Sequence, residues 1–515
     1  MRLIQEKNAF LKRHFKNNLP VFDALFFTQF PASSRRFFVI VSAFILSFSE
    51  MAKAEIDSSA YAIQLTIRGL KAPKAVLGYH YGDQKFIVDS ANIDTSTGFM
   101  RFATRKKLSE GVYFVAITEG SSKGILFDFI VAGDRDFSIE TTLNAPIDSA
   151  NIDRSLENTE FFNYQKKARK IQSEIAEMRS MRELLQRAKA DRATMAEQDK
   201  KMYEKAQELD VFTVAQIQKY PDNYTSKLLK LLRNPTVPTD IKPYGSDRKP
   251  NPNYAFWFRQ HYFDSVDFSD ERLLRSAFYS AKLGQFVSQI APPTPDSMTF
   301  YLDLILDKAR ANNLTVYQYT LRWLTNLFDS NIEKPFSDTY LVHLVEKYQH
   351  AADAGTDKAT LERLDYKVVA FKPNLIGSLA PPILLPNTEG SLTALAASKS
   401  DYTLLIFYSA LCKHCKESMP KIQQALQMTD STKISVFTVC TDGLKDAWLG
   451  FLSELKMENW TNVLDAKTDS DIQKKYATWN LPTLYLVDKQ KKIAAKRLKA
   501  EDLPDVVKAI FSDKK

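Results

Sequence analysis

The sequence contains little cysteine and little glycine. Three of its 515 residues are cysteine and 15 are glycine, which argues against a disulfide-stapled scaffold and a collagen-like repeat. With 44% hydrophobic and 25% charged residues, the composition is that of an ordinary globular protein, so wholesale disorder and a multi-spanning membrane protein are also disfavoured. Two of the three cysteines, Cys412 and Cys415, form a single C-x-x-C. This concentration is the first positive feature of the chain.

The N-terminal segment has the pattern of an export signal. Arg35-Arg36 precedes an apolar run at residues 37–48, and Ala52-Lys53-Ala54 follows as a small-x-small cleavage pattern. The run is shorter than the ~20 residues that a membrane-spanning helix needs. We therefore predict a signal peptide with an extended n-region at residues 1–54, and an exported protein in the periplasm or cell envelope. An uncleaved membrane anchor is the alternative.

The export signal accounts for much of the basic charge. Residues 1–54 contain eight Lys and Arg and three Asp and Glu, so setting them aside lowers the formal net charge from +9 to +4. That balance is ordinary for the remaining length and gives no reason to expect a nucleic-acid partner. The remaining chain is long enough for about three domains.

The first segment after the signal predicts a small antiparallel β-sandwich at residues 55–150. Tyr61, Ile63, Leu65 and Ile67 alternate with polar residues, as in a strand with one buried face. Further β-type runs lie at residues 76–81, 86–88, 99–102, 112–117 and 125–131, separated by glycine-containing turns.

The next segment, residues 151–370, predicts an α-helical domain. Apolar residues recur at spacings of three and four from Ile171 to Leu185, the pattern of a long amphipathic helix. Prolines between Pro235 and Pro252 predict an extended loop. Helical periodicity resumes at residues 273–286, 298–311, 317–328 and 339–348.

The C-terminal segment, residues 371–515, alternates strands with helices, which predicts a central sheet covered by helices. Strands are expected at residues 403–408, 434–439, 484–487 and 492–495, and helices after the C-x-x-C, at 448–455 and at 503–511.

This segment carries a resemblance to a known family. Phe407-Tyr408-Ser409-Ala410-Leu411-Cys412-Lys413-His414-Cys415, with Pro420 and Leu481-Pro482-Thr483, resembles the thioredoxin fold, and most of all the TlpA/ResA group of envelope thiol-disulfide oxidoreductases. The Ala380-Pro381 and Leu385-Pro386-Asn387 segment is similar to the initial hairpin of that group. The expected fold class is therefore a multi-domain α+β protein with a β-sandwich, an α-helical middle and a C-terminal thioredoxin-like domain.

The chemistry of the C-x-x-C follows from its position. At the start of a helix, the unpaired N–H groups and the helix dipole stabilise a thiolate on Cys412. Cys415, one turn inside, can then close a disulfide. We expect Cys412 to attack a substrate disulfide and Cys415 to release the mixed disulfide. No cofactor is expected beyond the redox-active Cys412–Cys415 pair.

Three further residues are candidates for the site. The resemblance implies that Pro482 is a cis-proline facing the disulfide; a trans-proline starting a strand is the alternative. Lys413 and His414 lie between the cysteines, where positive charge would favour the thiolate and raise the redox potential above thioredoxin's ~−270 mV. A solvated His414 without influence is the alternative.

Other positions depart from the family pattern. The buried acid of thioredoxin corresponds to Ile406, and the Glu that TlpA/ResA proteins place three residues after the second Cys corresponds to Ser418. Cys440 is interpreted as a small buried hydrophobe, with a second redox partner for Cys412 as the alternative. Scattered histidines offer no second ligand pair, so no metal site is expected.

The predicted function is thiol-disulfide exchange with envelope proteins, whose thiols or disulfides are the substrates. The resemblance also implies a membrane redox partner. One alternative is an envelope interaction protein with an incidental thioredoxin module. The other is a peroxiredoxin-like thiol peroxidase, which would need a proline where this chain has Leu405.

Overall fold

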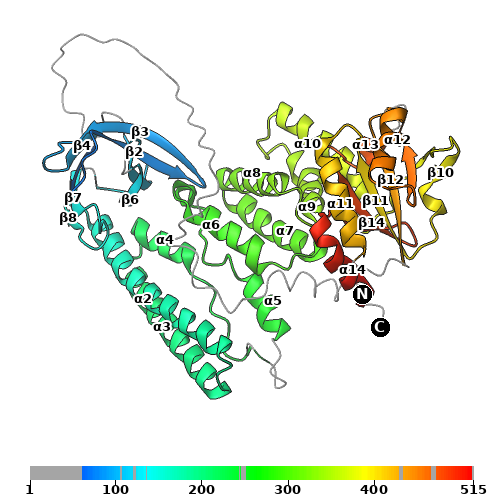
Figure 1. Ribbon diagram of the computed structural model, residues 1–515. Helices are drawn as coiled ribbons and strands as arrows, with labels where there is room; N and C mark the ends of the chain where they lie inside the picture. The colour runs from blue at the N-terminus through cyan, green and yellow to red at the C-terminus, as the bar shows by residue number, and fades with distance from the viewer. Residues whose placement is uncertain are drawn as a thin grey trace, which may run out of the picture. The chain divides into compact units, whose positions relative to one another are not determined.

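The computed structural model describes residues 61–104, 107–119, 123–134, 136–242, 244, 251–427, 433–465 and 471–512 (Figure 1). The predicted signal peptide lies outside these residues. The described chain divides into two compact units: one holds the residues up to Ala291 together with Asp307–Val316, and the other holds Pro292–Leu306 and the chain from Tyr317 on. The segment predicted as one helical domain is thus divided between the units, and the predicted domain limits stay predictions.

The first unit begins with two four-stranded sheets. One has the order β4-β1-β7-β8 and the other the order β3-β2-β5-β6. Their strands are β1 (Tyr61–Arg68), β2 (Lys74–Tyr81), β3 (Gln84–Asn92), β4 (Phe99–Thr104), β5 (Gly111–Ile117), β6 (Gly124–Val131), β7 (Asp136–Thr142) and β8 (Asn151–Asp153).

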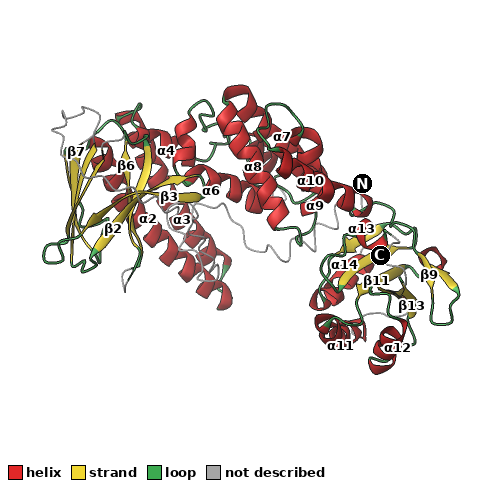
Figure 2. Ribbon diagram, turned by 90° about the horizontal axis from the view of Figure 1, so that it is seen from above, coloured by secondary structure: helices red, strands yellow, loops and turns green. Residues whose placement is uncertain are grey.

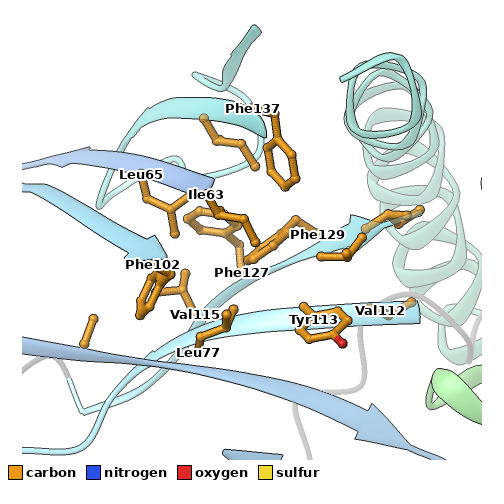
Figure 3. Close-up of a cluster of buried hydrophobic side chains, with 14 of the residues drawn as sticks. Ile63, Leu65, Leu77, Phe102, Val112, Tyr113, Val115, Phe127, Phe129 and Phe137 are labelled. Carbon is orange, nitrogen blue, oxygen red and sulfur yellow. The ribbon is translucent and has the colours of Figure 1, made fainter. Parts of the chain in front are cut away.

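Both sheets contribute to one hydrophobic core, shown in Figure 3. The predicted alternation in β1 is confirmed, since Ile63, Leu65 and Ile67 are completely buried. Leu77 and Val115 of the second sheet lie in the same core as Leu65. Burial of one face of each sheet against the other is what holds the two sheets together.

The prediction of a purely antiparallel arrangement is wrong at one ladder. β1 pairs with β7 in parallel, from Ala62 opposite Asp136 to Arg68 opposite Thr142. Parallel neighbours need a long connection, and here the chain passes through β4 and the four strands of the second sheet before it returns as β7. Buried and exposed side chains alternate along a strand in the same way whether its pairing is parallel or antiparallel, so the sequence pattern could not distinguish the two kinds of pairing.

Helices complete the first unit: α2 (Leu156–Arg187), α3 (Arg192–Lys219), α4 (Tyr224–Leu232), α5 (Pro252–Gln260), η1 (Glu271–Arg275), α6 (Phe278–Gln285) and η2 (Phe286–Ile290). The predicted long helix is α2, which lies beside α3 in both views (Figures 1 and 2). Ser155 caps the start of α2. In its first turn the buried Asn158 accepts the N–H of Ile130 over 2.7 Å and donates to the carbonyl of Ile130 over 2.8 Å. This pair of hydrogen bonds fixes the helix to strand β6.

The second unit contains a helical part and an α/β domain. The helical part comprises most of α7 (Pro295–Asn312) and α8 (Leu314–Ser330), then α9 (Ser337–Leu344), η3 (Val345–Gln349), α10 (Lys358–Phe371) and η4 (Lys372–Asn374). Asp303 of α7 accepts hydrogen bonds from Lys347 and Tyr348 over 2.8 and 2.7 Å. Helical periodicity predicted at residues 298–311, 317–328 and 339–348 is confirmed.

The α/β domain has a five-stranded sheet of order β13-β12-β11-β14-β15. Its elements are β9 (Leu384–Pro386), β10 (Leu392–Ala394), η5 (Leu395–Ala397), β11 (Tyr402–Tyr408), α11 (Lys413–Gln427), β12 (Ile434–Cys440), α12 (Lys445–Glu454), β13 (Thr461–Leu464), α13 (Ile472–Lys475), β14 (Thr483–Asp488), β15 (Ile493–Lys496), η7 (Ala500–Asp502) and α14 (Leu503–Ser512). The four predicted strands are present, and β9 and β10 form the expected hairpin. Strand β13 was not predicted.

The central strand β11 is buried on both faces. Leu404 and Ile406 belong to a core shared with α11, α12 and α14, whereas Leu405 and Phe407 belong to a second core on the other face. Such two-sided burial explains the continuous apolar run in the sequence. The sheet therefore holds the end of β11, and the C-x-x-C that follows it, on a rigid support.

Candidate active site

Cys412 and Cys415 lie where β11 passes into helix α11. Cys412 directly precedes the helix and is half-buried, while Cys415 in its first turn is completely buried. Both are free thiols. The backbone N–H of Cys415 donates to Cys412 Sγ over 3.3 Å. A helix N-terminus with an N–H donor aimed at the sulfur favours negative charge on Cys412.

Cys415 has the opposite environment. Burial raises the pKa of its thiol to about 12, and the neighbouring Cys412 adds to the rise although a backbone hydrogen bond from Ser409 opposes it. Cys415 is therefore protonated at neutral pH. The pair combines an accessible sulfur with a buried thiol one helical turn away.

Pro482 lies at the same end of the sheet as the cysteines. Strands β11 and β14 run antiparallel with Phe407 opposite Thr483, so the residue before Thr483 lies level with the end of β11. The Leu481–Pro482 peptide bond is cis. Leu481 and Cys412 both pack against the same buried cluster. The fold thus brings together Cys412, Cys415 and the loop of Pro482.

Lys413 and His414 are exposed on the first turn of α11. The Lys413 ammonium lies 3.8 Å from Glu417 on the same helix. An exposed ion pair of this kind contributes little energy and is screened by salt. The influence of both residues on the cysteines stays a prediction.

The structure adds a residue that the sequence analysis did not single out. Asp442 follows strand β12, and its Oδ2 accepts hydrogen bonds from the Ser409 hydroxyl over 3.0 Å and from the Leu411 N–H over 3.2 Å. Its Oδ1 accepts the thiol of Cys440 over 3.1 Å. Burial acts to raise the pKa of Asp442, but these hydrogen bonds outweigh it, and the pKa lies below its ordinary value. A carboxylate is therefore bound to the loop that carries Cys412.

Cys440 is completely buried at the end of β12, opposite Tyr408 of β11. Burial, together with its hydrogen bond to Asp442, raises the pKa of its thiol to about 12. This matches the interpretation of Cys440 as a small buried side chain. A signal for Asp442 was present in the sequence, because an acid two residues after a buried strand falls at the edge of the sheet where neighbouring strands of the same direction end.

Two other kinds of feature are absent from the described residues. No group of three or more His, Cys, Asp or Glu side chains there is arranged to hold a metal ion. None of the helices in the described ranges combines the length and the hydrophobicity that a membrane span requires.

The family model that matches this chain is that of the AhpC/TSA family, at residues 376–496. Among solved structures, a domain described as a possible thiol-disulfide isomerase from Cytophaga hutchinsonii is 31% identical; the match covers 27% of this chain and 95% of that one, with a TM-score of 0.26. A thiol:disulfide interchange protein from a Bacteroides species is 27% identical over 28% of this chain and 94% of that one, with a TM-score of 0.26.

The C-terminal domain is a TlpA-like thioredoxin-fold domain. A thioredoxin-like protein from Bacteroides caccae aligns over a longer part, 54% of this chain and 97% of that one, at 20% identity and a TM-score of 0.44. Among curated proteins, no sequence matches the chain. The resemblance drawn from Cys412, Cys415 and Pro482 is confirmed for the TlpA-like domain. The family does not by itself assign roles to these residues.

Proposed function

We propose that the TlpA-like domain catalyses thiol-disulfide exchange with envelope proteins through Cys412 and Cys415. The observation that carries the proposal is the contrast between the two sulfurs. Cys412 is accessible at a helix N-terminus with an N–H donor, whereas Cys415 is buried with its pKa raised to about 12. Cys412 is therefore suited to attack a substrate disulfide, and Cys415 is suited to remain a protonated thiol until the mixed disulfide has formed.

The exchange proceeds in two steps. The Cys412 thiolate attacks one sulfur of a substrate disulfide, forming a mixed disulfide and releasing the other substrate sulfur as a thiolate, which takes a proton. Cys415 then loses its proton and attacks Cys412 Sγ. This forms the Cys412–Cys415 disulfide and releases the second substrate sulfur. Electrons thus pass from the protein to the substrate, and the reverse sequence oxidises a substrate dithiol.

Pro482, Lys413 and His414 complete the proposed site. The loop of Pro482 lies at the same end of the sheet as Cys412, where an extended substrate segment would bind. The two residues between the cysteines would raise the redox potential by favouring the thiolate. The domain needs no cofactor for this chemistry beyond its own cysteine pair.

An exported location and a membrane redox partner belong to the proposal too. The signal pattern of residues 1–54 supports export. A partner that renews the cysteine pair is required by the chemistry, because each turnover changes the redox state of Cys412 and Cys415.

The test is reduction of insulin by the purified protein with dithiothreitol as electron donor. We expect the wild type to accelerate the precipitation of insulin chains, and Cys412→Ser to be as slow as the uncatalysed reaction. Gln424→Ala, an exposed change on the same helix α11, is the matched control and should retain full activity. Equal rates for wild type and Cys412→Ser would refute the proposal and favour an interaction protein. Reduction of hydrogen peroxide without insulin reduction would favour the peroxidase alternative.

A further inference from the structure

Asp442 brings a negative charge to the loop between β11 and α11. The three hydrogen bonds described above bind its carboxylate to Ser409, to Leu411 and to Cys440. Leu411 is the neighbour of Cys412 in the chain. The carboxylate therefore holds the backbone that presents the nucleophilic sulfur.

The donors that Asp442 uses are all uncharged. Within the described residues, no Lys, Arg or His nitrogen forms an ion pair with it, in contrast to Asp303, which is bound by Lys347 and His343. A hydroxyl, an amide and a thiol disperse the charge of a carboxylate but do not cancel it. Asp442 is half-buried, so the charge is screened less than that of a surface residue.

A fixed negative charge beside a cysteine pair has a defined redox consequence. The reduced form of the pair contains the Cys412 thiolate, and the oxidised disulfide is neutral. An anion raises the energy of the thiolate and leaves the disulfide unchanged. It therefore shifts the equilibrium toward the disulfide and makes the potential more negative.

We propose that Asp442 is a positioning residue that holds the Cys412 loop and makes the Cys412–Cys415 pair more reducing. The inference rests on the proposed function, and it assigns to Asp442 an influence opposite to that predicted for Lys413 and His414. Ile406 is buried in the core and Ser418 bears no charge. The carboxylate bound to the Cys412 loop comes instead from Asp442, in the segment that follows strand β12.

The test equilibrates the full chain with reduced and oxidised glutathione and measures the fraction of disulfide. In this reaction Cys412 and Cys415 give up two electrons and two protons as their S–S bond forms, and glutathione disulfide takes them to become two thiols. The variant is Asp442→Asn, which keeps an oxygen acceptor and removes the charge. We expect its equilibrium constant to shift at least threefold toward the dithiol; a tenfold shift would correspond to ~30 mV.

A second measurement separates the effect of the Asp442 charge from the effect of its side chain on the shape of the loop. In a Cys415→Ser background, the rate of Cys412 alkylation is measured against pH, and Asp442→Asn should move the midpoint to lower pH. Two controls accompany it. Asp446→Asn removes an exposed charge from α12 and should change neither readout. Ser409→Ala removes one hydrogen bond from Asp442 but keeps its charge, and should not shift the equilibrium toward the dithiol.

The outcomes are distinguishable. A wild type that does not equilibrate with glutathione would refute the proposed function itself. A wild type that equilibrates, with Asp442→Asn unchanged in both readouts, would overturn only the role of Asp442. A shift toward the dithiol that Ser409→Ala reproduces would also overturn it, because the loop rather than the charge would then be responsible. If Asp442→Asn does not fold, Asp442→Ser is measured in its place. Failure of both to fold would make Asp442 a purely structural residue.

Discussion

The backbone N–H of Cys415 lies 3.3 Å from Cys412 Sγ and donates to it. Because this donor belongs to the backbone, it survives replacement of the Cys415 side chain. A Cys415→Ser variant should thus keep a reactive Cys412 and lose only the resolving thiol.

We predict that Cys415→Ser accumulates mixed disulfides with oxidised protein substrates. Cys412 still attacks, but no second thiol releases the adduct. Non-reducing electrophoresis and mass spectrometry of the variant after incubation with substrate would detect the adducts, and they should map to Cys412. The Cys412→Ser/Cys415→Ser double variant is the control; adducts on it at the same level would contradict the assignment.

Cys415 should resist alkylation at neutral pH. Burial raises its pKa to about 12, so its thiolate fraction grows about tenfold per pH unit without a plateau below pH 10. In a Cys412→Ser/Cys440→Ser background, iodoacetamide labelling followed by mass spectrometry would measure this reactivity. When the same protein is unfolded in guanidinium, its labelling rate should reach half of its maximum at pH ~8.5, the ordinary pKa of a thiol. A midpoint as low as this for Cys415 in the folded protein would contradict the predicted burial of its thiol.

The buried Lys282 of the first unit leads us to predict that the free energy of unfolding depends on pH. Its side chain is completely buried, donates to the carbonyl of Arg233 over 2.9 Å and lies 4.4 Å from the centre of the Tyr262 ring. Burial lowers its pKa to about 7. Between that value and the pKa of ~10.4 in the unfolded chain, the unfolded chain binds more protons than the folded chain, so stability rises with pH.

Lys282→Met should remove this dependence. Relative to the variant, the wild type should gain up to ~1.4 kcal/mol of unfolding free energy per pH unit from pH 7 to pH 9. Below pH 7 both states are protonated and the difference should level off. Urea unfolding of both proteins at several pH values is the measurement. If the unfolding free energies of the wild type and the variant change in parallel with pH, Lys282 does not titrate in this range.

A buried ion cluster joins the helical part of the second unit to the TlpA-like domain. Asp338 of α9, 1% exposed, forms ion pairs with Lys496 and, over 3.0 Å, with Arg497. The Lys496 ammonium also donates to the side chain of Asn374 over 2.8 Å. Removing the carboxylate would leave two buried cations without an anion.

Asp338→Asn should lower the free energy of unfolding of the second unit by about 3–5 kcal/mol. Glu346→Gln breaks the exposed pair with Lys372 and should cost less than ~1 kcal/mol. Hydrogen exchange of the β15 amides in both variants would report the loss locally. Equal protection in the two variants would contradict a stabilising role for Asp338.

Several features were predictable from local patterns. Strict alternation of apolar residues identified β1, apolar spacings of three and four identified α2, and a continuous apolar run identified β11. In each case the spacing of the apolar residues shows which side chains face the core. The parallel pairing of β1 with β7 was not predictable, since it depends on where the chain returns. Strand β13 was missed because four residues, Thr461–Leu464, are too few to establish a period.

The cysteine pair, its position before a helix and the Leu481-Pro482-Thr483 motif can be identified from the sequence, because each is a property of a few consecutive residues. Which groups surround the cysteine pair depends on the tertiary fold. Asp442 lies 30 positions beyond Cys412 in the chain and is bound to its loop because β11 and β12 are parallel neighbours in register, from Tyr402 opposite Ile434 to Tyr408 opposite Cys440. The charge beside a thiolate is thus set by strand pairing, which brings together side chains that no local spacing connects.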